Sequence, residues 1–280
     1  MTSSNIHLSR YNNAVDFLNI VYSFLSEAPY TNGYILGSLA DENNEFTVIF
    51  DSKKCPILAV MTQPSKTFIL SHSTSWTTEA LEVLISDIKL NNLPITGIRG
   101  PENVTTEFSQ IFERVFQKSM VPGEPSRIYK CTSVIPTPNL PQNGVKRLAQ
   151  AENLDLISHW LEEFFVECQV HVSEDPKPIA KESIESNSMY FWENSLGEIV
   201  SMAAFKRANE FSVNVCYVYT PKQFRGKGYA YQLVKGLTLE LLEKYPAVVL
   251  NAFTSNEISQ GVYKKIGFTK VIETMDYRNF

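Results

Sequence analysis

The segment VYTPKQFRGKGYA, residues 218–230, constrains the fold more than any other part of the chain. It places Gly226 and Gly228 between a strand-like apolar run and a helix-like run. Glycine adopts backbone conformations that other residues resist, and it lets a ligand approach the main chain closely. The first amides of a following helix lack intrahelical acceptors, and the helix dipole makes that end positive. The pattern predicts an anion site suited to a pyrophosphate, with a plain strand-to-helix connector as the alternative.

Strand and helix patterns alternate on both sides of this turn. The helix after the turn carries an apolar stripe that includes Ala230, Leu237 and Leu241, and it ends near Pro246. A helix is predicted over residues 154–165, and another over 257–266 stops at a glycine, as helices often do. The predicted strands, of which the middle three form an antiparallel meander, are Val145–Leu148, Met189–Trp192, Ile199–Phe205, Phe211–Tyr219 and Val248–Leu250.

The clearest boundary in the chain is VIPTPNLPQNG, residues 134–144, where three prolines fall within six positions. Proline blocks both helix interiors and central strands, so this stretch indicates a linker between domains 1–140 and 145–280. Helical spacing recurs over residues 81–88 and 104–116. The strands expected in the first domain are Tyr34–Leu39, Phe46–Phe50, Ile57–Val60 and Phe68–Leu70. Both domains are thus predicted to be mixed α/β.

Composition excludes several classes of protein. Of the 280 residues, 44% are hydrophobic, which indicates a globular chain with a sizeable core. Lys and Arg number 25 against 30 Asp and Glu, and a net charge of -5 argues against a nucleic-acid partner. No apolar run approaches the 18 or so residues of a membrane span, so we expect a cytoplasmic protein with no membrane partner.

The four cysteines are widely spaced and form no CxxC pair, which argues against a disulfide framework or a zinc knuckle. No trio of His, Asp, Glu or Cys has the spacing of metal ligands, so no metal is expected.

Residues 145–280 resemble the GNAT superfamily of acetyl-CoA-dependent N-acyltransferases. Arg225, Gly228 and Ala230 fit its R/Q-x-x-G-x-G/A pyrophosphate motif. A later N-(x)6-Y-(x)3-G-F pattern is matched by Asn256, Tyr263, Gly267 and Phe268. The chain looks closest to bacterial two-half members with a glycine-acyltransferase-like second domain. The resemblance implies a central, mostly antiparallel mixed sheet flanked by helices, with a degenerate GNAT-like first domain over 1–140.

The resemblance also implies roles for individual residues. The strand edge at Val218, Tyr219 and Thr220 would pair with the pantetheine arm of acetyl-CoA as another strand does. Asn256 would hydrogen-bond the cofactor, and Tyr263 would lie near its sulfur. The amides that bind the pyrophosphate would come from Arg225, Gly226, Lys227, Gly228, Tyr229 and Ala230.

In that family a bulge splays the strand ending at Tyr219 from the next strand, near Val248–Leu250, and the thioester enters the gap. Attack by an unprotonated amine builds charge on the carbonyl oxygen, which a strand amide near Tyr219 can stabilise. The hydroxyl of Tyr263 can then protonate the departing thiolate. No covalent enzyme intermediate is required.

A base for the amine is harder to assign. The strand after the cofactor helix ends in Leu250–Phe253, where many relatives carry an acid and this chain has Asn251. Glu167 is the candidate we favour, and Glu193 is the alternative. Two histidines, His159 and His171, are similarly placed. Carboxylates and histidines at such positions are more often surface or structural groups.

Each assigned residue has a plainer interpretation as well. Tyr263 can be a core aromatic, Asn256 an ordinary helix cap, and Arg225 an exposed turn residue. The predicted function is acetyl or short acyl transfer from acetyl-CoA to a small-molecule or peptide amine. The alternatives are a non-catalytic acyl-CoA-binding or sensing protein, or a first domain that delivers the second to a protein substrate. A homodimer stays open.

Overall fold

The computed structural model describes residues 6–137, 143–168 and 175–279, and the chain forms two compact units. Contacts assign the C-terminal residues to the first unit, so the two units interleave along the chain and a single cut does not separate them. Unit 1 comprises Met1–Ile128, Ala252–Ser255 and Lys270–Phe280, and unit 2 comprises Tyr129–Asn251 and Asn256–Thr269.

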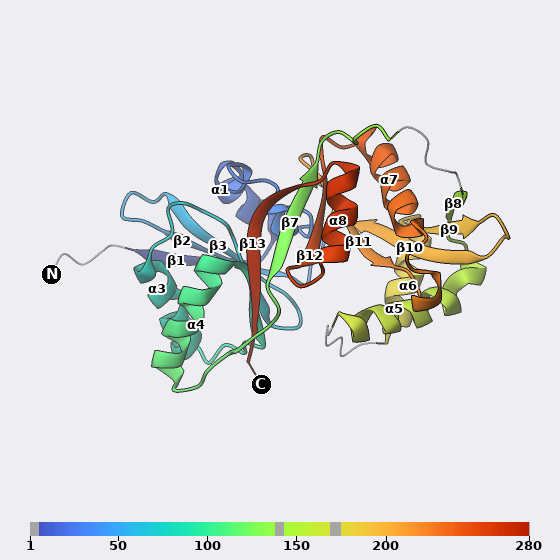
Figure 1. Ribbon diagram of the computed structural model, residues 1–280. Coiled ribbons are helices and arrows are strands. Elements are labelled where there is room, and N and C mark those ends of the chain that lie inside the picture. The colour runs from blue at the N-terminus through green and yellow to red at the C-terminus, as the bar shows by residue number, and fades with distance from the viewer. Residues whose placement is uncertain (1–5, 138–142, 169–174, 280) are drawn as a thin grey trace. The chain divides into compact units, whose positions relative to one another are not determined.

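Unit 1 is built on a mixed sheet (Figure 1). Its strand order is β1-β2-β3-β4-β5-β13, antiparallel throughout except that β4 and β5 run parallel. The short strand β6 (Val121–Pro122) pairs with β13, and the unit boundary falls within β7 (Ser126–Cys131). The other strands are β1 (His7–Tyr11), β2 (Glu45–Phe50), β3 (Pro56–Thr62), β4 (Thr67–Leu70), β5 (Gly97–Pro101) and β13 (Thr269–Arg278).

Helices cover both faces of this sheet. On one face α1 (Ala14–Ser26) packs on β2, where Phe17 stacks on Phe46 with ring centroids 4.5 Å apart. On the other face α3 (Thr78–Leu90) and α4 (Glu102–Phe116) enclose an aliphatic and aromatic core with β2 to β5 (Figure 1). The helices predicted over residues 81–88 and 104–116 are confirmed.

The strand predicted at Tyr34–Leu39 is wrong. These residues form the short helix α2 (Gly33–Leu36) and the turns after it, with Ile35 and Leu36 buried. An apolar run of this length fits a buried helical turn as well as a strand, and periodicity cannot separate the two. The other three strands expected in this half are confirmed as β2, β3 and β4.

Unit 2 contains an antiparallel meander of four strands, with a fifth strand, β12, parallel to β11. The strands are β8 (Gly144–Leu148), β9 (Met189–Asn194), β10 (Ile199–Lys206), β11 (Val213–Tyr219) and β12 (Val248–Phe253). All five strands predicted for this half are present, and the predicted mixed α/β class is confirmed.

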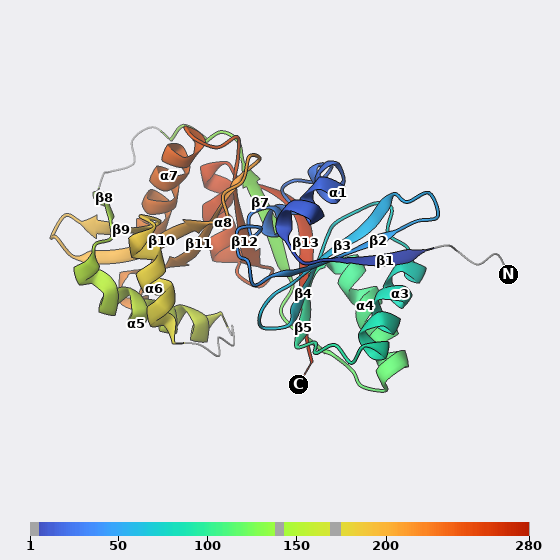
Figure 2. The same ribbon diagram turned by 180° about the vertical axis from the view of Figure 1, so that it is seen from behind.

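The helices of unit 2 lie on opposite sides of this sheet, as both views show (Figures 1 and 2). Helix α7 (Tyr229–Leu242) packs on one face, and α5 (Leu154–Glu167) with α6 (Pro176–Glu185) packs on the other. Helix α8 (Glu257–Ile266) begins and ends where the sequence predicts. Among the described residues, no helix is long and apolar enough to cross a bilayer.

Candidate functional site

Strand β11 carries a bulge near its carboxyl end. Between two pairs with β10, Met202 to Tyr219 and Ala204 to Cys216, β11 advances by one residue more than β10 does. Tyr217 lies inside this interval with a φ of 52°, a left-handed conformation that costs free energy for a tyrosine. Such strain clusters at ligand sites, and a bulge redirects the strand that carries it. The bulge that the resemblance implied is present.

Beyond the bulge, β11 separates from β12. The parallel register joins Val213 to Val248, then Asn214 to Val249, and within the described residues it ends at Val215 and Leu250. The stretch from Cys216 to Tyr219 therefore has β10 on one side and no register partner in β12 on the other. A strand edge of this kind can pair with an extended ligand.

The glycine turn follows directly. Gly226 and Gly228 have φ of 79° and 80°, in the left-handed region that glycine adopts without strain. A Cβ added to either would meet nothing within 4 Å, so the space in front of the turn is open. Gly228 is the N-cap of α7 and provides no side-chain cap, which leaves the first helical amides free of a side-chain acceptor at that position. Tyr229 and Ala230 are the first residues of the helix.

Arg225 fixes the turn to its surroundings. Its Nε donates to the carbonyl oxygen of Thr220 at 2.7 Å, and its Nη2 donates to Oε2 of Glu167 at 2.6 Å. The hydrogen bond to Glu167 is the main reason why the pKa of Arg225 is raised. The predicted base Glu167 and the predicted phosphate ligand Arg225 are thus brought together, and each is the partner of the other.

A second carboxylate of α5 reaches the same strand end. The hydroxyl of Tyr219 donates to Oε2 of Glu163 at 3.1 Å. Burial, followed by this hydrogen bond and the charge of Glu163, raises the pKa of Tyr219 to about 12. Glu163 is not among the base candidates predicted from the sequence, although the four-residue spacing of His159, Glu163 and Glu167 on a helix predicts one shared face.

Helix α8 supplies the other two predicted residues. Asn256 is its N-cap, with Oδ1 accepting from the amide of Ser259 at 3.0 Å. Tyr263 is 6% exposed, and its hydroxyl is hydrogen-bonded to Ser259. Burial raises the pKa of Tyr263, and the nearby Cys168 thiol adds to the rise while the Ser259 hydrogen bond opposes it. This hydroxyl therefore stays protonated at neutral pH and is available as a donor.

His159 neighbours Glu163 on α5, whereas Glu193 and Asn251 lie on strands. Glu193 is on β9, two strands from β11, and forms an ion pair with Arg147 at 2.6 Å. Asn251 on β12 is exposed. His171 lies outside the described residues. His159 has its Nε2 3.8 Å from Oε1 of Glu163 and is well exposed.

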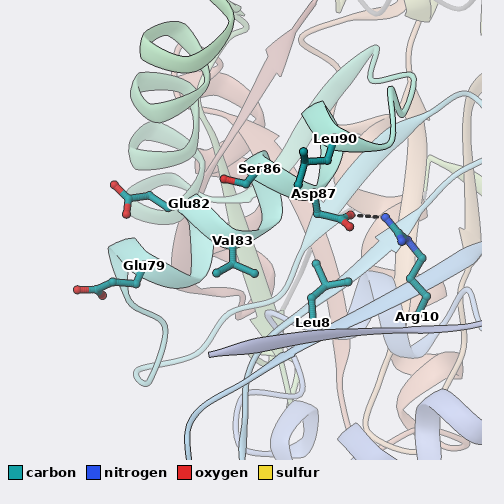
Figure 3. A pocket seen from close by; sticks show the side chains of 8 residues that line it. All are labelled: Leu8, Arg10, Glu79, Glu82, Val83, Ser86, Asp87 and Leu90. Atoms are coloured by element: carbon teal, nitrogen blue, oxygen red, sulfur yellow. Dashed lines mark hydrogen bonds and ion pairs between the residues drawn. The ribbon is translucent and has the colours of Figure 1, made fainter. Parts of the chain in front are cut away.

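Two other features bear on what can bind. In the part of the chain that the structure describes, no group of three or more His, Cys, Asp or Glu side chains could hold a metal ion. A surface hollow of about 590 Å³ lies in unit 1 between β1 and α3, and Figure 3 shows Arg10 paired with Asp87 beside Leu8 and Leu90. It contains none of the residues predicted for the site.

Comparisons with known proteins agree with this geometry. The FR47-like protein family model matches residues 195–277, which include the bulged strand, the glycine turn and α8. No curated protein matches the chain in sequence.

Three solved structures extend the likeness to the whole chain. A GNAT-family acetyltransferase from Colwellia psychrerythraea is 10% identical over 98% of this chain and 100% of its own, with a TM-score of 0.59. A GCN5-related N-acetyltransferase from Sphaerobacter thermophilus is 11% identical over 98% and 95%, with a TM-score of 0.63. A tandem GNAT protein from the clavulanic acid biosynthesis pathway is 11% identical over 98% of both chains, with a TM-score of 0.59.

These findings confirm the resemblance that the motifs predict. The chain has the GNAT fold, and its similarity to a tandem GNAT protein covers both units. The predicted fold class is confirmed with it.

Proposed function

We propose that this protein transfers an acetyl or other short acyl group from acetyl-CoA to a primary amine. The observation that carries the proposal is the open, uncapped glycine turn at Gly226 and Gly228, directly after a strand that splays from its neighbour. A plain strand-to-helix connector needs neither the open space nor the splay. Both are what a ligand with a pyrophosphate and an extended arm requires.

The parts of this ligand match the parts of the site. The pyrophosphate lies against the amides at the start of α7, where the helix dipole is positive. The pantetheine arm runs along the edge formed by Val218, Tyr219 and Thr220, where the ladder with β12 has ended. Arg225 contributes by holding the turn to α5 and to Thr220. The thioester then lies between β11 and β12.

The chain's own groups serve each step of the transfer. An amide near Tyr219 donates to the carbonyl oxygen as charge develops there. The Tyr263 hydroxyl donates a proton to the sulfur as the carbon–sulfur bond breaks, and burial keeps this hydroxyl protonated up to that step. Glu167 is the base for the amine that the sequence favours. Its ion pair with Arg225 also holds the glycine turn to α5.

A non-catalytic acyl-CoA-binding protein is the second candidate. The observation that favours it is Asn251, which occupies the position on β12 where many members of the resembled family carry an acid. Both candidates require cofactor binding, and only the first requires turnover.

The test uses the full chain with acetyl-CoA and four acceptors: an amino acid, a polyamine, an aminoglycoside and a short peptide. Free thiol is measured with and without each amine, and acetyl-CoA binding is measured by calorimetry. Amine-dependent thiol release supports the transferase. Saturable binding of acetyl-CoA, with no thiol release with any of the four acceptors, supports the non-catalytic binding protein. Absence of binding contradicts both.

A further inference from the structure

Helix α5 carries three ionisable side chains, one every four residues, and one of them contacts Tyr219 at the carboxyl end of β11. They are His159, Glu163 and Glu167, and the helical repeat places them on one face. The same helix packs on β11 through Trp160, whose ring centroid is 6.2 Å from that of Tyr219. The acidic face of α5 is therefore held against the bulged part of the strand.

The two carboxylates on this face have different partners. Glu167 binds the guanidinium of Arg225 at 2.6 Å, a contact that ties it to the glycine turn. Glu163 accepts from the neutral hydroxyl of Tyr219 at 3.1 Å, and its other oxygen lies 3.8 Å from His159. The Glu163 side chain is 42% exposed, so a ligand or a water molecule can reach it. Of the pair, Glu163 keeps an oxygen open to a small molecule.

The position of Glu163 relative to the sheet decides which ligand it meets. Helix α7, whose first turn faces the pyrophosphate in the proposed function, lies on the opposite side of the sheet from α5 (Figures 1 and 2). An amine has to approach the thioester from the side that the cofactor leaves free. That side is the face of β11 covered by α5, where Tyr219 and Glu163 meet.

We infer that Glu163 takes the proton from the acceptor amine, and that the Tyr219 hydroxyl positions its carboxylate. As the amine nitrogen forms its bond to the acyl carbon and the carbon–sulfur bond breaks, the nitrogen becomes acidic. One proton passes from nitrogen to Glu163, and the thiolate receives one from Tyr263. This inference rests on the proposed acyl transfer and assigns the base to Glu163 in place of Glu167, whose carboxylate is engaged by Arg225.

The groups facing Glu163 agree with this role. His159 is on its own helix, Tyr219 comes from β11, and the Arg225–Glu167 pair lies one helical turn away. The charge of Arg225 is already balanced by Glu167, so Glu163 is not held in a second ion pair with it.

The test measures kcat and both KM values of the full chain with acetyl-CoA and the best amine of the four-acceptor panel. Glu163→Ala is expected to lower kcat roughly 10²-fold with the KM for acetyl-CoA unchanged. Added formate is expected to restore part of the rate in proportion to its concentration. Glu163→Gln is expected to show the same loss, and Tyr219→Phe a loss of roughly 30-fold, the value of one hydrogen bond to a charged group.

Two matched variants on the same helix separate chemistry from structure. Glu167→Gln is expected to raise the KM for acetyl-CoA with a smaller effect on kcat, because it releases Arg225. Glu162→Ala, on the exposed side of α5, is expected to match wild type and to ignore formate.

Wild-type kcat in Glu163→Gln, or a kcat loss in Glu163→Ala that formate does not change, overturns the assignment and leaves the transferase standing. No thiol release by the wild-type chain with any of the four amines overturns the transferase and the assignment together.

Discussion

Both units contain a strand–helix–strand motif with parallel strands, but the turn between the first strand and the helix differs between them. In unit 2, β11 leads through Gly228 into α7 and then to the parallel strand β12. In unit 1, β4 leads into α3 and then to the parallel strand β5. Helix α3, however, is capped by Thr77, whose side chain accepts from the amide of Ala80 at 3.3 Å. The N-terminus of α7 therefore has no side-chain cap, whereas the N-terminus of α3 is capped by Thr77.

Backbone amides in the loop before α3 also donate hydrogen bonds to protein side chains. Asn32 accepts from the amide of His72 at 2.7 Å, and Ser73 accepts from the amide of Ser75 at 2.8 Å. The amides of His72, Ser75 and Ala80 therefore already have protein acceptors.

The strands differ as well. β4 pairs with both neighbours without a bulge, and Gly100 of β5 lies so close that an added Cβ would be 2.9 Å from the Leu70 carbonyl oxygen. Unit 1 thus lacks the space between strands that unit 2 has. Under the proposed function, cofactor binding is therefore expected in unit 2, where the turn is uncapped and the strands part, and not in unit 1.

The largest expected effect comes from filling the open turn. Gly228→Val places a branched side chain in the space before α7 and demands a φ of 80° from it. Losing two hydrogen bonds to a charged group predicts an acetyl-CoA affinity about 10³-fold weaker, measured by calorimetry.

Gly197→Val is the matched control, because Gly197 has a φ of 78°, also meets nothing within 4 Å and lies in the β9–β10 turn. The strained φ should lower the thermal midpoint of both variants, and Gly197→Val should keep the wild-type affinity for acetyl-CoA. Equal affinities in the two folded variants would contradict the assignment of the cofactor site to the Gly228 turn.

The next effect concerns α8 and its counterpart α4. Tyr263 is seven residues after the N-cap Asn256, and Phe108 is seven residues after the N-cap Pro101. Tyr263→Phe therefore gives unit 2 the ring that unit 1 has. We expect kcat to fall roughly 10²-fold with acetyl-CoA affinity unchanged.

The deficit should shrink between pH 7 and about 9, because the CoA thiol, with a reference pKa near 8.5, leaves more easily without a proton as pH rises. Full activity with a lowered thermal midpoint would make Tyr263 a packing residue. A constant deficit across this range would indicate that the hydroxyl orients the cofactor.

A smaller effect is expected from the closed strands of unit 1. Gly100→Ala forces β5 away from the backbone of Leu70, and overpacking of this kind costs about 1–3 kcal/mol of unfolding free energy. Denaturant unfolding measures the loss, and acetyl-CoA affinity should not change. Gly236→Ala inside α7 is the control, since its nearest contact is an ordinary 3.8 Å, and it should stabilise the chain. A weakened affinity in folded Gly100→Ala would argue that unit 1 takes part in binding.

The smallest effect is at the cap of α3. Thr77→Ala removes the acceptor for the Ala80 amide and should cost about 1 kcal/mol, seen as a drop of a few degrees in thermal midpoint. Acetyl-CoA affinity should stay at the wild-type value, because the strands beside this helix remain closed. A second acetyl-CoA bound per chain in this variant would show that the cap alone keeps unit 1 empty.

The sequence predicts those elements whose signals are local. Helix α8 has a capping residue at Asn256 and a terminating Gly267, and both ends are predicted correctly. Strand β13 was missed because its first residues, Thr269–Glu273, do not alternate between polar and apolar, and alternation is confined to Thr274–Arg278. The alternation in β11 gives the strand but hides the bulge, since the left-handed φ of Tyr217 depends on its pairing with β10 and not on its own residue type.

The residues of the candidate site also divide into those with a local sequence signal and those that depend on tertiary packing. Gly226, Gly228 and Asn256 are recognisable from their order in the chain, because the glycines shape a local turn and Asn256 caps the helix that follows it directly. The ion pair of Arg225 with Glu167 and the contact of Tyr219 with Glu163 join residues 58 and 56 positions apart. Such pairs depend on how α5 packs on β11, which no local pattern encodes.

The assignment of β13 to unit 1 has a consequence for synthesis on the ribosome. Thr274–Arg278 pair with Pro101–Gly97 of β5, yet they are translated after residues 129–251 of unit 2. Until then β5 has an open edge, and unit 1 cannot complete its sheet while the rest of the chain emerges. An unpaired strand edge is a site of mispairing, so a nascent chain of this topology is expected to need its last strand, or a chaperone in its place, before it is safe from aggregation.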